Sequence, residues 1–110
     1  KLSYIKYINQ RYSADKISKL LRQIVEIIDA EVISESLQDY EPHGASSVIL
    51  LSDVKSVNMR LDKSHITAHT YPDFDSHSEF LSFRVDIELS TCGNITPLKS
   101  LNKIFKFFDT

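Results

Sequence analysis

The stretch Phe83-Arg84-Val85-Asp86-Ile87-Glu88-Leu89-Ser90 decides the fold, because its side chains alternate strictly between apolar and polar. Successive side chains of a β-strand point to opposite faces of the sheet, so this pattern predicts a half-buried antiparallel strand with one face in water. The apolar face requires a second layer of secondary structure to cover it. The segments that could form this layer lie near the two ends of the chain.

Two amphipathic helices are predicted. Residues 14–30 place apolar side chains at the i, i+3, i+4, i+7 spacing of one buried stripe, and Ser13 precedes them as an N-cap. The second helix follows Thr96 and Pro97, which are typical of an N-cap and of the first helical position. The residues before Ser13 are compatible with a shorter helix. The apolar positions of the two main helices are Ile17, Leu20, Leu21, Ile24, Val25 and Ile28, then Leu98, Leu101, Ile104, Phe105 and Phe108.

Further strands are predicted between these helices. Their bounds are 31–40, 45–52, 57–63 and 65–71. The turn Pro42-His43-Gly44 separates the first two, Pro72 is expected to end the last, and the polar stretch 73–79 is predicted to be a loop. The order of helix, strands and helix predicts an α+β fold, a two-layer sandwich of a mainly antiparallel sheet with helices on one face.

Composition and charge exclude several classes of function. The chain has 110 residues, with 13 basic against 15 acidic side chains and a net charge of −2. This balance predicts neither a nucleic-acid partner nor binding to an anionic membrane. No run approaches the roughly 18 apolar residues that a membrane helix needs. The single cysteine cannot form an intramolecular disulfide, which indicates a reducing compartment, and we predict a single-domain cytoplasmic protein.

The spacing of the histidines argues against a metal site. In a strand, His65 and His69 lie roughly 13 Å apart at about 3.3 Å per residue, too far for one zinc ion with bonds of about 2 Å. The β-branched residues beside them and Pro72 favour extended chain over a helix that would bring the pair together. We therefore predict no metal site. Taken without further context, Ser64, His65, His69, His77 and Cys92 are more typical of structural roles than of catalytic ones.

Several blocks of sequence bear on function when they are taken together. They are residues 61–72 (LDKSHITAHTYP) and 83–93 (FRVDIELSTCG), with 38–46 (QDYEPHGAS) upstream and 95–99 (ITPLK) downstream. In this order they strongly resemble the prokaryotic S-adenosylmethionine decarboxylase proenzymes, and most of all the branch from Gram-negative bacteria, in which a lysine precedes the serine. Relative to that branch, the connection 52–61 is shorter, and strands before the first helix and after Phe108 are missing. The resemblance therefore implies a chain truncated at both ends or a reduced relative.

Membership of this family implies that the protein makes its own cofactor. The hydroxyl of Ser64 attacks the carbonyl of Lys63, the peptide becomes an ester, and β-elimination turns Ser64 into an N-terminal pyruvoyl group by way of dehydroalanine. His69 matches the family histidine that assists this processing. An ideal strand places Ser64 and His69 on opposite faces, so we expect a bend or bulge between them. The single decarboxylase-like domain, residues 1–110, is thereby cut into residues 1–63 and 64–110.

The resemblance also implies roles in catalysis. The pyruvoyl group forms a Schiff base with S-adenosylmethionine and takes up the electrons left by carbon dioxide, and the product serves spermidine biosynthesis. Cys92 matches the cysteine that returns a proton to the α-carbon. Asp73 stands where the family has an acidic residue that binds the ribose, although glutamate is usual there. Tyr71 is expected to form a wall of the adenine pocket, and Tyr40, Tyr71 and Phe83 offer aromatic faces to the sulfonium.

The family implies a homo-oligomer of processed two-chain protomers, and some members use Mg²⁺ as an activator. Two alternatives remain open at this point. One is a related pyruvoyl decarboxylase that acts on another amino acid, such as ornithine or arginine. The other is a catalytically degenerate α+β interaction domain.

Overall fold

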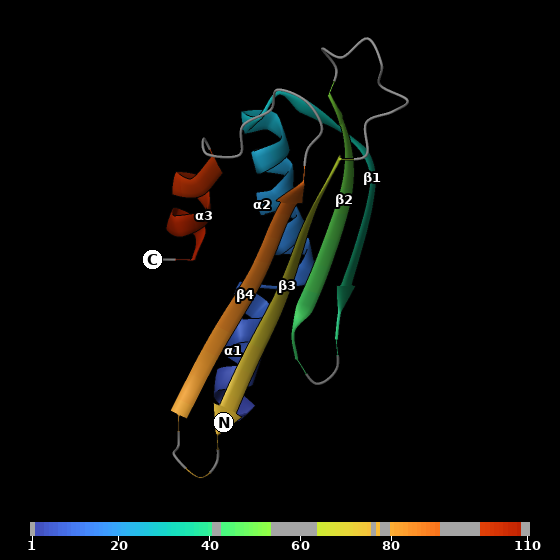
Figure 1. Cartoon of the computed structure of the whole chain (residues 1–110). Helices are drawn as coiled ribbons and strands as arrows, with labels where there is room; N and C mark the ends of the chain where they lie inside the picture. Colours follow the sequence, from blue (N-terminus) through green and yellow to red (C-terminus); the bar gives the residue numbers. More distant parts are fainter. Residues whose placement is uncertain are drawn as a thin grey trace.

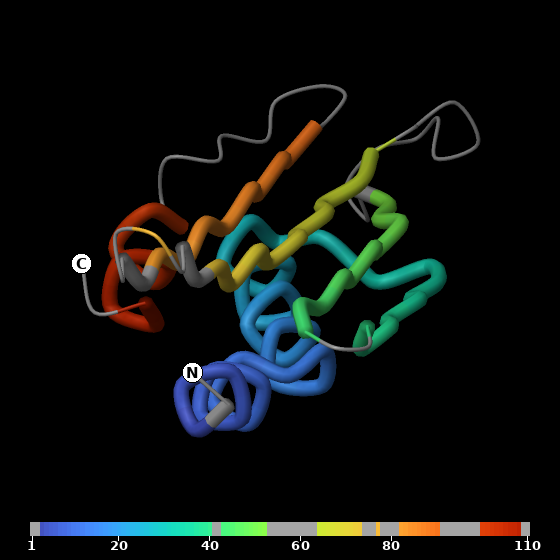
Figure 2. The backbone as a smooth tube through the Cα atoms, turned by 90° about the horizontal axis from the view of Figure 1, so that it is seen from below, coloured from blue at the N-terminus to red at the C-terminus, as the bar shows by residue number. Residues whose placement is uncertain are grey.

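The structure, a computed structural model, describes residues 2–40, 43–53, 64–75, 77, 80–90 and 100–108. Among these, antiparallel strands form a four-stranded sheet in the order β1-β2-β3-β4, with the helices on one face (Figure 1). Figure 2, a view from below, shows the two layers. The predicted two-layer α+β sandwich is confirmed. The elements are α1 (Leu2–Arg11), α2 (Ala14–Ile27), β1 (Ala30–Asp39), β2 (Ala45–Asp53), β3 (Ser64–Asp75), β4 (Phe80–Ser90) and α3 (Leu101–Phe107).

Helix α2 forms the centre of the core. The Oγ of Ser13 accepts a hydrogen bond from the backbone N–H of Lys16, which confirms the predicted N-cap. The carboxylate of Asp39 at the end of β1 accepts a hydrogen bond of 2.8 Å from the backbone N–H of Ala14, so the sheet also holds the start of the helix. The apolar stripe of α2 packs on the covered face of the sheet, mainly on Ile49, Leu51, Ile66 and Ala68.

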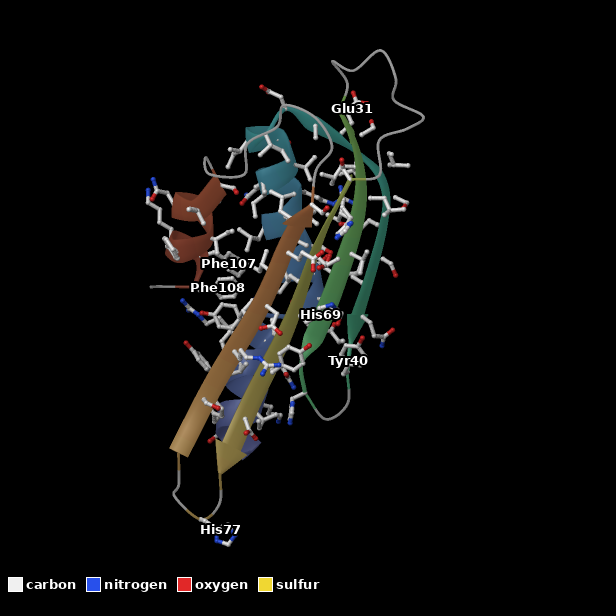
Figure 3. The ribbon with its side chains drawn as sticks, in the orientation of Figure 1. Glu31, Tyr40, His69, His77, Phe107 and Phe108 are labelled. Atoms are coloured by element: carbon white, nitrogen blue, oxygen red, sulfur yellow. The ribbon has the colours of Figure 1, made fainter. Side chains whose placement is uncertain are left out.

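An aromatic cluster closes the core between β4 and α3. The ring of Tyr12 stacks on Phe83 at 4.8 Å between centroids and lies 5.7 and 5.2 Å from Phe107 and Phe108. Figure 3 labels Phe107 and Phe108 beside α3. The C-terminal part of the second predicted helix is thus confirmed as α3. The predicted cap at Thr96 and Pro97 and the predicted strand 57–63 lie outside the described residues. Within the described residues, no helix is long and apolar enough to cross a membrane.

Two predictions about the middle of the chain are wrong. Strand β3 continues through Pro72 to Asp75, and its register with β4 is unbroken from His65 onward, so residues 73–75 of the predicted loop 73–79 are strand. Pro72 is tolerated because the pairing of β3 with β2 ends at His69. Beyond that residue β3 has a neighbour on one side only, and a proline without an N–H is compatible with such an edge.

An ion pair joins α2 to β1 and leads to a prediction about pH. The Nε of Arg22 donates a hydrogen bond of 2.8 Å to Oε2 of Glu35. This bond holds the pKa of Glu35 below its usual value, although burial acts in the opposite direction. A carboxyl group whose pKa is lowered on folding stabilises the protein above its unfolded-state pKa, and this contribution disappears as the pH falls through the folded-state pKa.

We therefore expect Glu35→Gln to lower the urea midpoint of unfolding at pH 7 and to have a smaller effect at pH 3, because protonation of the wild-type carboxyl group removes the stabilisation as the pH falls through the folded-state pKa. The matched control is Glu31→Gln, an exposed carboxylate on the same strand. Urea titrations at the two pH values measure the effect. An equal loss of stability from Glu35→Gln at both pH values would contradict the prediction.

Candidate functional site

Strand β3 divides its side chains between the two faces of the sheet. Ser64 lies on the helix-covered side with an exposed fraction of 3%, whereas His69 and Tyr71 lie on the open side. The pairing of β3 with β2 runs without a shift from Ser64 to His69, and its pairing with β4 is equally regular. The expected bulge between Ser64 and His69 is therefore absent. Five residues of strand separate their Cα atoms by roughly 17 Å.

His69 is held by a serine on the neighbouring strand. Ser46 lies directly opposite His69 in the register of β2 and β3, and its Oγ is 2.6 Å from Nδ1 of the imidazole. The exposed fraction of Ser46 is 8%, so little water competes for this bond. The bond orients the ring and leaves Nε2 as the nitrogen available for proton transfer with a ligand. The sequence-based reasoning assigned no role to Ser46, because the partner of His69 depends on strand register.

The turn between β1 and β2 forms one wall of the site. Gly44 has φ +97°, a conformation that favours glycine, and a Cβ at this position would lie 2.8 Å from the backbone oxygen of Thr70. The N–H of Tyr40 donates to the Gly44 carbonyl at 2.9 Å, and the N–H of Ala45 donates to Oγ1 of Thr70 at 2.8 Å. This close approach places the turn against the strand that carries His69.

These elements enclose an open pocket of about 700 Å³ on the uncovered face of the sheet. That volume suits a small molecule of metabolite size. Figure 3 labels His69 on β3 and Tyr40 at the end of β1, while His77 lies beyond the far end of β3, away from both. The walls come from the turn (Tyr40, His43), from β2 (Ser46), from β3 (His69 to Asp73) and from β4 (Ser82, Arg84).

The pocket unites some of the predicted site residues and separates others. It brings His69, Tyr71 and Asp73 together with Tyr40, and the rings of His69 and Tyr71 are 6.5 Å apart. Ser64 lies on the opposite face. Phe83 also lies on the helix-covered side, stacked on Tyr12, so its suggested contact with a sulfonium is wrong. Lys63 and Cys92 lie outside the described residues.

The described residues offer no set of ligands for a metal ion. Within that part of the chain, no three histidine, cysteine, aspartate or glutamate side chains are grouped so that they could hold one. Magnesium needs several oxygen ligands in near-octahedral geometry. The described residues therefore do not fit a magnesium site, and no step below involves one.

Helix α1 supports the end of the sheet that carries Asp73. The hydroxyl of Tyr4 donates a hydrogen bond of 3.0 Å to the backbone oxygen of Ser82, the residue opposite Asp73 in the β3–β4 register. Burial, and secondly the negative charge of Asp73, raise the pKa of Tyr4 above its ordinary value. Tyr4 therefore remains a neutral donor at physiological pH, and it fixes β4 beside the pocket.

Comparisons with known proteins point to one family. The family model described as S-adenosylmethionine decarboxylase matches residues 9–110. The S-adenosylmethionine decarboxylase proenzyme of Clostridium perfringens is 39% identical over 132 residues, covering 100% of this chain and 49% of the relative. The proenzyme of Marinobacter nauticus is 42% identical over 125 residues, covering 98% of this chain and 48% of the relative. The chain thus spans about half the length of the curated relatives it matches.

A solved structure shows the same fold. The crystal structure of the adenosylmethionine decarboxylase from Aquifex aeolicus superposes with a TM-score of 0.52 at 22% identity, covering 86% of this chain and 64% of that chain. The alignment with the C. perfringens relative is longer than the 110 residues of this chain, so the relative carries segments that this chain lacks. With most of its length matched by the family model and its relatives, the chain belongs to the S-adenosylmethionine decarboxylase family.

Proposed function

We propose that this chain is part of a self-processing, pyruvoyl-dependent decarboxylase that converts S-adenosylmethionine to its decarboxylated form for spermidine biosynthesis. The observation that carries the proposal is the Ser46–His69 hydrogen bond at the base of a pocket that also holds Tyr71 and Asp73. The names of the relatives support S-adenosylmethionine over ornithine or arginine as the substrate, and they disfavour a degenerate interaction domain. A cytoplasmic location is part of the proposal and rests on the single cysteine.

His69 is the group that moves protons during processing. The two ring nitrogens of an imidazole allow it both to accept and to return a proton. Ser46 acts through His69 as a positioning residue, because its hydrogen bond to Nδ1 sets the direction of the ring. The roles of Lys63 as the residue before the cleaved bond and of Cys92 as the proton donor rest on family membership alone.

The pocket suits a cationic nucleoside. The rings of Tyr40 and Tyr71, both half-exposed, offer flat surfaces to a purine or to a sulfonium, and Asp73 offers a carboxylate to ribose hydroxyls. Aspartate is one methylene shorter than the glutamate usual in the family, which favours a ribose lying close to the end of β3. Ser64, the residue that would become the pyruvoyl group, lies on the opposite face of the sheet from this pocket. Once formed, that group would supply a carbonyl that accepts the electrons released on decarboxylation.

We include a homo-oligomer of processed two-chain protomers in the proposal. Within one chain, Ser64 and His69 lie on opposite faces of the sheet and roughly 17 Å apart along the strand, too far for direct proton transfer. A second copy can supply the histidine that a single chain cannot bring to its own serine.

Intact mass spectrometry after incubation under native conditions tests the proposal. The wild type is expected to give a chain that ends at Lys63 and a second chain, starting at position 64, that carries a hydrazine-reactive carbonyl. Ser64→Ala should remain whole, and the matched control Ser36→Ala, an exposed serine of β1, should be cleaved like the wild type. A wild type that stays whole and lacks the carbonyl would refute self-processing. Release of labelled carbon dioxide from S-adenosylmethionine, ornithine or arginine then identifies the substrate.

A further inference from the structure

Arg84 and Asp86 on β4 form a cluster with Tyr71 that the roles above do not use. The guanidinium carbon of Arg84 lies 4.3 Å from the centroid of the Tyr71 ring, and its Nε lies 3.3 Å from Oδ1 of Asp86. In the register of β3 and β4, Arg84 is opposite Tyr71 and Asp86 is opposite His69. A carboxylate, a guanidinium and an aromatic ring therefore follow one another on the open face beside His69.

Stability does not explain this cluster. The side chains of Arg84 and Asp86 have exposed fractions of 67% and 53%, and exposed ion pairs contribute little to folding because water and salt screen them. The geometry has a local effect instead. Asp86 restrains the guanidinium, which in turn covers one face of the ring of Tyr71, a residue that is 43% exposed with Arg84 in place. The pocket wall at Tyr71 is thereby fixed before a ligand arrives.

The guanidinium also determines what the ring can bind. The face of an aromatic ring attracts cations, and Arg84 already supplies one to Tyr71. A second cation against the same ring would meet a like charge, whereas an uncharged planar base can stack on it without that penalty. In the described part of the chain, the cation–ring contacts are Arg84 on Tyr71 and Arg11 on Tyr12. Tyr40, on another wall of the pocket, is the ring left for a cationic group.

We propose that Arg84 is a positioning residue that holds Tyr71 as the stacking surface for the uncharged base of the ligand and directs the sulfonium toward Tyr40. This inference rests on the proposed function, because it divides that substrate into its base and its cationic part. Asp86 has an indirect role, because it holds the guanidinium of Arg84 over the ring of Tyr71.

Two simple probe molecules test binding of the base and binding of the sulfonium separately. Adenosine carries the base without the sulfonium, and S-methylmethionine carries the sulfonium without the base. We expect Arg84→Met to weaken adenosine binding about tenfold, by analogy with the loss of a base–aromatic stack. Binding of S-methylmethionine should be unchanged or tighter. Arg84→Lys, which retains the charge but not the planar group, should lie between wild type and Arg84→Met.

Calorimetric titrations of the processed protein measure these affinities. Tyr71→Leu should lose about as much adenosine affinity as Arg84→Met, and the double variant should lose no more than Tyr71→Leu alone, because Arg84 acts through the ring. For turnover of S-adenosylmethionine, Arg84→Met should raise KM by a larger factor than it lowers kcat. The matched control is Arg11→Met, which removes the other arginine–tyrosine contact, away from the pocket.

Each result of these titrations either supports or overturns the proposed role of Arg84. Equal adenosine affinity in wild type and Arg84→Met would overturn it, as would additive losses in the double variant with Tyr71→Leu. A wild type that binds no adenosine would overturn both the inference and the substrate pocket. Self-cleavage of the wild type tests the proposed function separately, since it requires no adenosine binding.

Discussion

Co-expression of Ser64→Ala and His69→Ala chains is expected to restore the self-cleavage that each variant lacks alone. Ser64→Ala has no hydroxyl to attack the peptide bond. His69→Ala retains the hydroxyl but loses the group that transfers protons, and such groups typically accelerate reactions about 10²–10⁴-fold. We therefore expect the rate of cleavage of His69→Ala alone to fall at least about a hundredfold.

Rescue follows from the position of the two residues on opposite faces of β3. Because one chain cannot bring its own His69 to its own Ser64, the histidine of a Ser64→Ala chain can serve the serine of a His69→Ala partner. Random pairing of equal amounts of the two chains places about half of the His69→Ala chains in mixed dimers. About half of the His69→Ala chains should therefore be cleaved. Tags of different length distinguish the two variants, so intact mass spectrometry can measure the cleaved fraction of each.

The control for this experiment is His69→Ala co-expressed with the double variant Ser64→Ala/His69→Ala. These pairs contain no His69, so the chains should stay whole. Failure of the first mixture to cleave, with formation of mixed oligomers shown by co-purification, would mean that both residues act within one chain. The strand between Ser64 and His69 would then have to rearrange before processing.

Gly44→Ala is expected to lower the free energy of unfolding by about 2–3 kcal/mol and to slow self-cleavage, because an added Cβ is both strained and crowded. The backbone at this position has φ +97°, and the new methyl carbon would lie 2.8 Å from the carbonyl oxygen of Thr70. Either the turn or β3 must move, and both form walls of the pocket. Urea denaturation and the cleavage assay measure the two effects.

Ser34→Ala, an exposed position on β1, is the matched control and should change the free energy of unfolding by no more than about 0.5 kcal/mol. Stability equal to wild type in Gly44→Ala would contradict the close approach of the turn to β3. A loss of stability without slower cleavage would mean that the turn supports the fold but not the catalytic geometry.

Features carried by local patterns could be predicted from the sequence. The alternation of residues 83–90 and the helical spacing after Ser13 depend on periods of two and 3.6 residues, which each segment displays without reference to the others. The α+β sandwich followed from them. The end of β3 could not be predicted in this way, because the tolerance of Pro72 depends on where the neighbouring β2 stops.

The candidate site shows the same division between local and tertiary information. The sequence by itself determined the family and the chemical types of the pocket residues, and it supplied the proposal that Ser64 is the processing serine, since these are carried by contiguous motifs. Only the tertiary structure decided that Ser46 holds His69, that Arg84 covers Tyr71 and that Ser64 faces the other way. These relations depend on the register between strands, and a shift by one residue would move every side chain to the opposite face. Register is a property of paired segments, so no single segment reveals it.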